Sequence, residues 1–95
     1  MALSVGPISV EAQQQLTLSL EFYRQGNYAE SLSAAKKAVQ IAPRYAEAYN
    51  NMAAAYNAMG RLDDGMTAAA EAFRISPDFQ LARNNFAWAA ARKAK

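Results

Sequence analysis

The stretch that decides the fold runs from Pro43 to Pro77 and reads PRYAEAYNNMAAAYNAMGRLDDGMTAAAEAFRISP. Its two prolines are 34 residues apart, and Gly60 lies 34 residues after Gly26. Other pairs that keep this interval are Leu18 and Met52, Phe22 and Tyr56, Tyr28 and Leu62, Ala38 and Ala72, Asn50 and Asn84, and Asn51 and Asn85. A register kept across glycine, proline and apolar positions predicts tandem structural repeats.

Within each unit, apolar residues recur at the spacing of an amphipathic helix. A first helix after Ser9, a candidate N-cap, should end at Gly26, because glycine readily adopts the left-handed conformation at helix C-termini. Further helices are predicted over 28–42, 46–59 and 62–75, with proline blocking continuation after the second and fourth. Asp78 is the predicted N-cap of a fifth helix that runs to about Arg92.

Composition excludes several classes of function. The 95 residues are rich in alanine, carry a net charge of +2, and include no Cys and no His. Disulfides, thiolate catalysis and the commonest metal ligands are therefore absent from the sequence. No apolar run approaches the length of a membrane span. We predict no catalytic residues, no metal, no cofactor, no nucleic-acid partner and no direct membrane insertion, and a cytoplasmic location, although a parent protein anchored in a membrane is compatible with the sequence.

This spacing resembles the tetratricopeptide repeat (TPR), a 34-residue helical hairpin. The residues that match its pattern in the second repeat are Tyr49, Met52, Ala53, Tyr56, Gly65, Ala72 and Pro77, and those in the first are Leu18, Ser19, Phe22, Ser31, Ala38 and Pro43. Ala35 and Ala69 replace a large aromatic residue of the pattern, which implies tightly packed hairpins or a small cavity.

The resemblance implies an all-α fold, a right-handed superhelix of five antiparallel helices. The expected organisation is a leader over 1–9, repeats over 10–45 and 46–79, and a C-terminal capping helix over 80–95. It also implies a concave groove lined by the first helix of each hairpin, and a protein or peptide partner of unknown identity. The function expected is that of a non-catalytic protein–protein interaction module, and the sequence is compatible with a domain excised from a larger protein.

The residues predicted to contact a peptide in that groove are Leu16, Leu20, Tyr23, Asn50, Asn51, Asn57, Asn84, Asn85 and Trp88. An Asn amide offers both donors and an acceptor, which match a peptide backbone. Asn51 and Asn85, one repeat apart, would form a two-rung ladder that Thr17 interrupts in the first repeat. The alternatives are that the Asn side chains only cap helices or face solvent, and that the apolar side chains pack in the core. Leu18 and Phe22 are predicted to be core residues.

Two further interpretations concern the partner. Some TPR domains hold the acidic C-terminal tail of heat-shock chaperones with a clamp of basic and Asn side chains. The corresponding positions here are Leu16, Leu20, Asn51, Leu81 and Asn85, which lack cations, so this ligand is not expected. The alternative function is structural self-association, as a homo-oligomer joined through the open solenoid ends or as a segment of a longer repeat array.

Overall fold

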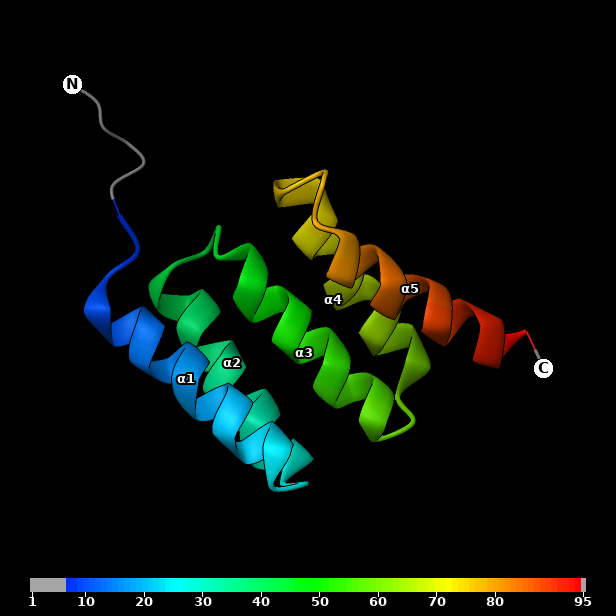
Figure 1. The fold of residues 1–95 in the computed structure, drawn as a ribbon, viewed down its shortest axis with the longest axis horizontal. Helices are drawn as coiled ribbons and strands as arrows, with labels where there is room; N and C mark the ends of the chain where they lie inside the picture. The colour runs from blue at the N-terminus through cyan, green and yellow to red at the C-terminus, as the bar shows by residue number, and fades with distance from the viewer. Residues whose placement is uncertain (1–6, 95) are drawn as a thin grey trace.

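A computed structural model describes residues 7–94, and these form an all-α helical repeat. The helices are α1 (Val10–Arg24), α2 (Tyr28–Ile41), α3 (Ala46–Ala58), α4 (Leu62–Ile75) and α5 (Gln80–Lys93). Figure 1 shows α1, α3 and α5 side by side in one layer, with α2 and α4 behind them. The first two pairs of helices form antiparallel hairpins, and α5 packs against both α4 and α3.

The turn within each hairpin is made by a glycine in the left-handed conformation. Gly26 has φ = 79° and Gly60 has φ = 78°, values that side chains other than glycine rarely tolerate. At the first turn the Asn27 N–H donates to the Phe22 carbonyl oxygen at 2.8 Å, and at the second the Arg61 N–H donates to that of Tyr56 at 2.9 Å. These bonds occupy carbonyls that a helix C-terminus leaves without partners.

The connection from each hairpin to the next helix depends on proline. Helices α2 and α4 end at Ile41 and Ile75, and the residue after each is extended, with ψ = 88°. Proline at the next position disfavours helical backbone in the residue before it, so both helices end there. Ser9 caps α1 as predicted, because its side chain accepts a hydrogen bond from the Ala12 N–H.

The core is built largely of alanine. Ala35 and Ala69, where the repeat pattern has a large aromatic residue, are both fully buried, so the hairpins are tightly packed. Small side chains allow helix axes to approach closely. One buried cluster joins α2, α3 and α4 around Leu32 and Tyr56, and a second joins α1, α2 and α3 around Tyr45.

Two sequence predictions are wrong. Leu18 is 44% exposed and therefore does not lie in the core, although its equivalent Met52 packs against α2 and the surrounding cluster. The difference arises because α1 has no preceding hairpin among the described residues to cover its outer face. The N-cap of α5 is Phe79, not Asp78, and no side chain caps this helix. Most of the predicted leader lies outside the described residues, which begin at Pro7.

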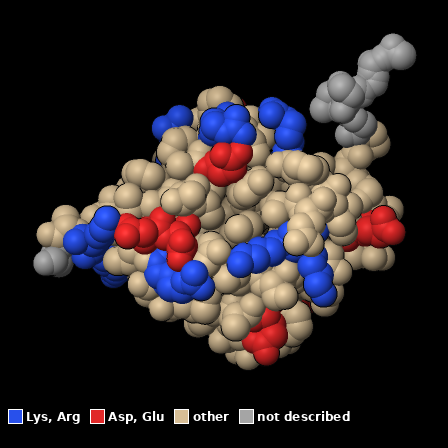
Figure 2. All heavy atoms as spheres, turned by 180° about the vertical axis from the view of Figure 1, so that it is seen from behind, with Lys and Arg blue, Asp and Glu red and all other residues tan. Residues whose placement is uncertain are grey.

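Helices α2 and α4 form the face on the far side of α1, α3 and α5. Lys, Arg, Asp and Glu side chains of both signs are scattered over it (Figure 2). They include an ion pair within α4, between Arg74 and Glu71. No helix in the described part of the chain is long and apolar enough to cross a membrane.

Candidate functional site

Two adjoining hollows lie along the face formed by α1, α3 and α5. The first, of about 190 Å³, is lined by Leu20, Tyr23, Ser31, Asn50, Asn51 and Ala54. The second, of about 320 Å³, is lined by Tyr23, Ala54, Asn57, Ala58, Asn84, Asn85 and Trp88. Because Tyr23 and Ala54 line both hollows, the two form one continuous groove, which we call the amide groove. No charged side chain lines it.

Aromatic side chains form two walls of the second hollow, one from each outer helix of the layer. Tyr23, at the end of α1, packs edge-on against Tyr28 with ring centroids 5.2 Å apart. Trp88 on α5 has the Arg92 guanidinium 3.8 Å from its ring centroid. Tyr23 and Trp88 are 38% and 41% exposed, so both residues leave apolar surface at the groove. The floor between them is small, because α3 contributes Ala54 and Ala58 there.

Amides of the groove bridge neighbouring helices. The Asn51 Nδ2 donates to the Ser19 hydroxyl of α1 at 3.2 Å, and the Asn85 Nδ2 donates to the Asn50 Oδ1 of α3 at 2.7 Å. Each of these bonds uses one N–H of the donating amide. Since an Asn amide has two N–H donors and an acceptor oxygen, Asn51 and Asn85 each retain a donor and an acceptor for another molecule.

Asn57 has a different role from the other amides. Only 7% of it is exposed, and its Nδ2 donates to the Asn85 carbonyl oxygen at 3.1 Å, joining α3 to α5. Its Oδ1 has no hydrogen-bond partner in the described part of the chain and lies against Gly65 of α4. A Cβ at Gly65 would be 1.9 Å from that oxygen, so Gly65 is the residue that makes room for the buried amide.

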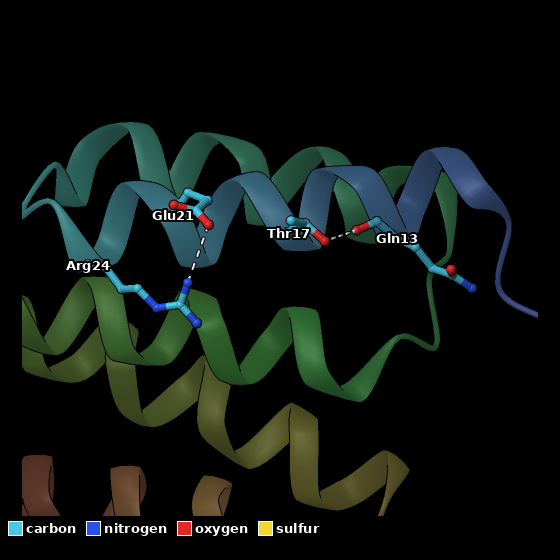
Figure 3. A network of polar contacts seen from close by, with 4 residues as sticks. All are labelled: Gln13, Thr17, Glu21 and Arg24. Atoms are coloured by element: carbon cyan, nitrogen blue, oxygen red, sulfur yellow. Dashed lines mark hydrogen bonds and ion pairs between the residues drawn. The ribbon is translucent and has the colours of Figure 1, made fainter.

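Helix α1 contributes little hydrogen-bonding capacity to the groove. The Thr17 hydroxyl donates to the Gln13 carbonyl oxygen of its own helix at 3.1 Å (Figure 3). Further along the same helix, Arg24 pairs with Glu21 at 3.3 Å. The predicted amide ladder therefore has no rung on α1, as the sequence indicated.

Eight of the nine predicted groove residues line the two hollows. The exception is Leu16, which is half-buried and packs against the cluster around Tyr45. Asn57 lines the second hollow but is mostly enclosed, so it serves the packing of three helices as well.

The repeat pattern includes Ser19 and Ser31, but the sequence did not predict the buried hydrogen bond by which they join α1 to α2. The Ser31 hydroxyl donates to the Ser19 carbonyl oxygen at 2.8 Å, and both side chains are fully buried. The signal that would have found them is the repeat register, since Ser31 and Gly65 are 34 residues apart and both are small. Small residues at equivalent positions of a repeat mark the point where two helices cross closely.

The chemistry of the site is that of recognition by neutral groups. Among the described residues no three His, Cys, Asp or Glu side chains gather where they could hold a metal ion. The titratable group whose pKa is lowered most clearly, the Glu71 carboxyl, lies on α4 away from the groove, and hydrogen bonds from Arg74 cause the shift. The groove thus offers amides and aromatic rings, which bind through hydrogen bonds and apolar contact.

Comparison with known proteins gives concordant matches. A family model described as "TPR repeat" matches residues 20–60, and one described as "Tetratricopeptide repeat" matches residues 46–79. Among solved structures, the first TPR domain of Spaghetti (RPAP3), bound to the HSP90 peptide SRMEEVD, superimposes with a TM-score of 0.85. The two are 19% identical, and the match covers 88% of this chain and 67% of that one. No curated protein sequence matches the chain significantly.

Proposed function

Because the chain belongs to the tetratricopeptide-repeat family, whose members are generally non-catalytic protein-interaction modules, we propose that it binds an extended segment of a partner protein along the amide groove. The observation that carries this proposal is the set of unused donors and acceptors on Asn51 and Asn85, beside two half-exposed aromatic rings. Neutral amides suit a peptide backbone, and exposed aromatic rings suit apolar side chains of the partner.

The groove lacks the cations that would clamp the terminal carboxylate of a chaperone tail, although the structurally similar Spaghetti domain was solved with an HSP90 peptide. That likeness, at 19% identity, concerns the fold. A carboxylate-binding clamp requires cations, and the positions where it would lie hold Leu16, Leu20 and Leu81 beside two asparagines. We therefore expect the partner segment to be held by its backbone and by an apolar anchor.

Self-association through the solenoid ends is the second candidate, and the exposed Val10 and Leu18 on the outer face of α1 favour it. The neighbouring positions weigh against it. In α3, the fully buried Ala48 and Ala55 pack where α1 has Gln14 and Glu21, both exposed. The outer face of α1 is thus polar where a stacked hairpin would need small apolar side chains, as terminal repeats of solenoids generally are.

The test is selection of linear peptides from a random library displayed on phage, with the purified chain as bait. We expect enriched peptides to lose at least about tenfold in affinity for the double variant Asn51→Ala with Asn85→Ala. Since both amides also make internal hydrogen bonds, thermal unfolding of the variant must confirm that it is folded at the assay temperature. Gln40→Ala, an exposed substitution on α2, is the matched control and should bind normally. Failure to enrich any peptide, or equal binding by the double variant, would contradict the proposal.

A further inference from the structure

The second hollow of the groove suits a more restricted class of ligand group than the groove as a whole. It lies between the rings of Tyr23 and Trp88, over a floor that includes Ala54 and Ala58. Its volume of about 320 Å³ is at the small end of the range for small-molecule sites, about 300–1,000 Å³. A hollow this small, open on one side and walled by rings, suits one large side chain of a peptide.

The walls are held in place, which makes the hollow a preformed feature. Tyr28 braces Tyr23 edge-on, and Arg92 stacks on Trp88. The walls stand on either side of α3, which is joined to α1 by the Asn51–Ser19 bond and to α5 by the Asn57 bond to the Asn85 backbone. Preformed walls reduce the entropy lost when a ligand binds, so aromatic anchors of this kind contribute strongly to affinity.

Arg92 is the charged residue that stacks directly on a wall of the hollow. No carboxylate lines either hollow of the groove. Arg92 lies at the α5 wall and makes no ion pair with any described residue, whereas the nearby Lys93 pairs with Asp63 at 2.7 Å. Arg24 follows Tyr23 on α1, and it is paired with Glu21 at 3.3 Å. A segment passing over this hollow therefore meets the Arg92 cation at its α5 edge and no anion in its lining.

We propose, resting on the function above, that this hollow seats a large apolar side chain of an extended partner segment, with a carboxylate of the same segment beside it facing Arg92. The apolar side chain lies between the Tyr23 and Trp88 rings. The carboxylate forms an ion pair with the Arg92 guanidinium at the rim, where it adds selectivity more than affinity. The partner is thus recognised by an apolar residue with Asp or Glu one or two positions away.

The peptides selected from the random library test this pattern directly. We expect enrichment of Leu, Met or Phe with an acidic neighbour. Synthetic versions, amidated at the C-terminus to remove the terminal carboxylate, should shift the fluorescence of Trp88, which is the single tryptophan of the chain. Replacing the apolar residue by Ala should weaken binding at least about tenfold, and replacing the acid by its amide about threefold.

Variants of the protein locate the effect. Tyr23→Ala, which keeps the tryptophan signal, should lose at least about tenfold in affinity. Arg92→Gln should abolish the difference between the acidic peptide and its amide. Ile41→Ala is the matched control, because Ile41 on α2 is 45% exposed, close to the 41% of Trp88, and does not line the groove.

The outcomes separate this inference from the function on which it rests. Peptides that depend on Asn51 and Asn85 but show no apolar residue beside an acid would overturn the inference and leave the peptide-binding function standing. Undiminished binding by Tyr23→Ala would do the same. Absence of any enriched peptide would contradict both.

Discussion

The helices of the first hairpin meet through two serines, whereas those of the second meet through an alanine and a glycine. In the first, the Ser31 hydroxyl donates to the Ser19 carbonyl oxygen at 2.8 Å. In the second, the equivalent residues are Gly65 and Ala53, and a Cβ added to Gly65 would lie 3.4 Å from the Ala53 carbonyl oxygen. The two crossings thus lie at equivalent positions of the repeat and differ in chemistry.

The difference shows that the residue at a helix crossing depends on the side chain that packs beside that crossing. The second hairpin has Asn57 where the first has Tyr23, and only the Asn side chain turns inward to lie against the crossing. Glycine in a helix interior costs about 0.5–1 kcal/mol relative to alanine. Gly65 is therefore explained by the amide that occupies its Cβ space, and the hairpin gains the Asn57 bond to α5 in exchange.

The largest effect should come from filling that space. Gly65→Ala should lower the free energy of unfolding by about 1–3 kcal/mol, because the new Cβ displaces the buried Asn57 amide. Adding Asn57→Ala should recover most of the loss, since the Cβ then fits and alanine favours helix. Urea denaturation of the two variants measures this. A Gly65→Ala protein as stable as the wild type would break the proposed link between the two residues.

A smaller effect should appear in the first hairpin. Ser31→Ala removes the buried hydroxyl that bonds to Ser19 and should cost about 1 kcal/mol of the free energy of unfolding. Ser33→Ala, an exposed substitution on the same helix, should change stability by less than about 0.5 kcal/mol. The measurement is again urea denaturation. If the two variants were equally stable, the Ser31 hydrogen bond would contribute nothing to stability, and close packing alone would stabilise the serine crossing.

The smallest effect concerns pH and should distinguish α4 from α2. Hydrogen bonds from Arg74 lower the pKa of Glu71 below its ordinary value of 4.5, so the folded state binds the Glu71 proton less readily than the unfolded state. The stabilisation is therefore complete above that value and is lost as the pH falls through the lower, folded pKa. The equivalent residues of α2 are Lys37 and Gln40, which form no such pair.

Thermal unfolding of Glu71→Gln checks this expectation. The variant should be slightly less stable than the wild type at pH 7, and the difference should shrink in acid. Glu30→Gln, an exposed substitution on α2, is the control for removing one surface carboxylate. A stability difference between the wild type and Glu71→Gln that increased on acidification would contradict the expectation.

The fold was predictable because its signals are local and repeated. Gly26, Gly60 and the prolines after α2 and α4 fix the turns by backbone sterics alone, which a sequence reveals directly. Burial that depends on a residue's position in the repeat array was harder to predict from the sequence. Leu18 has the register of a core residue, and it is exposed because burial of that position requires a neighbouring hairpin. The cap of α5 was misplaced because helix ends are uncertain by one or two residues.

The resemblance to the repeat family implied a groove and its residues, but it did not predict how the amides of that groove bond. Register places Asn57 on the same face as the other groove residues, and nothing in that register distinguishes an amide that faces solvent from one that turns inward. Whether the Asn57 amide turns inward depends on Gly65, which is eight positions later and on another helix. Partners of this kind are set by three-dimensional packing, so they become visible only when the helices are placed.

The bond from Asn57 to α5 has a consequence for building longer arrays. Its acceptor is a backbone oxygen, which every residue at that position supplies. The Asn50–Asn85 bond joins positions that both recur in a tandem copy, since Asn85 is the equivalent of Asn51. Segment 46–79 could therefore be concatenated with itself, and each junction would regenerate the same connections. The first hairpin lacks this self-compatibility, because Leu16 and Thr17 stand where the amides would be needed.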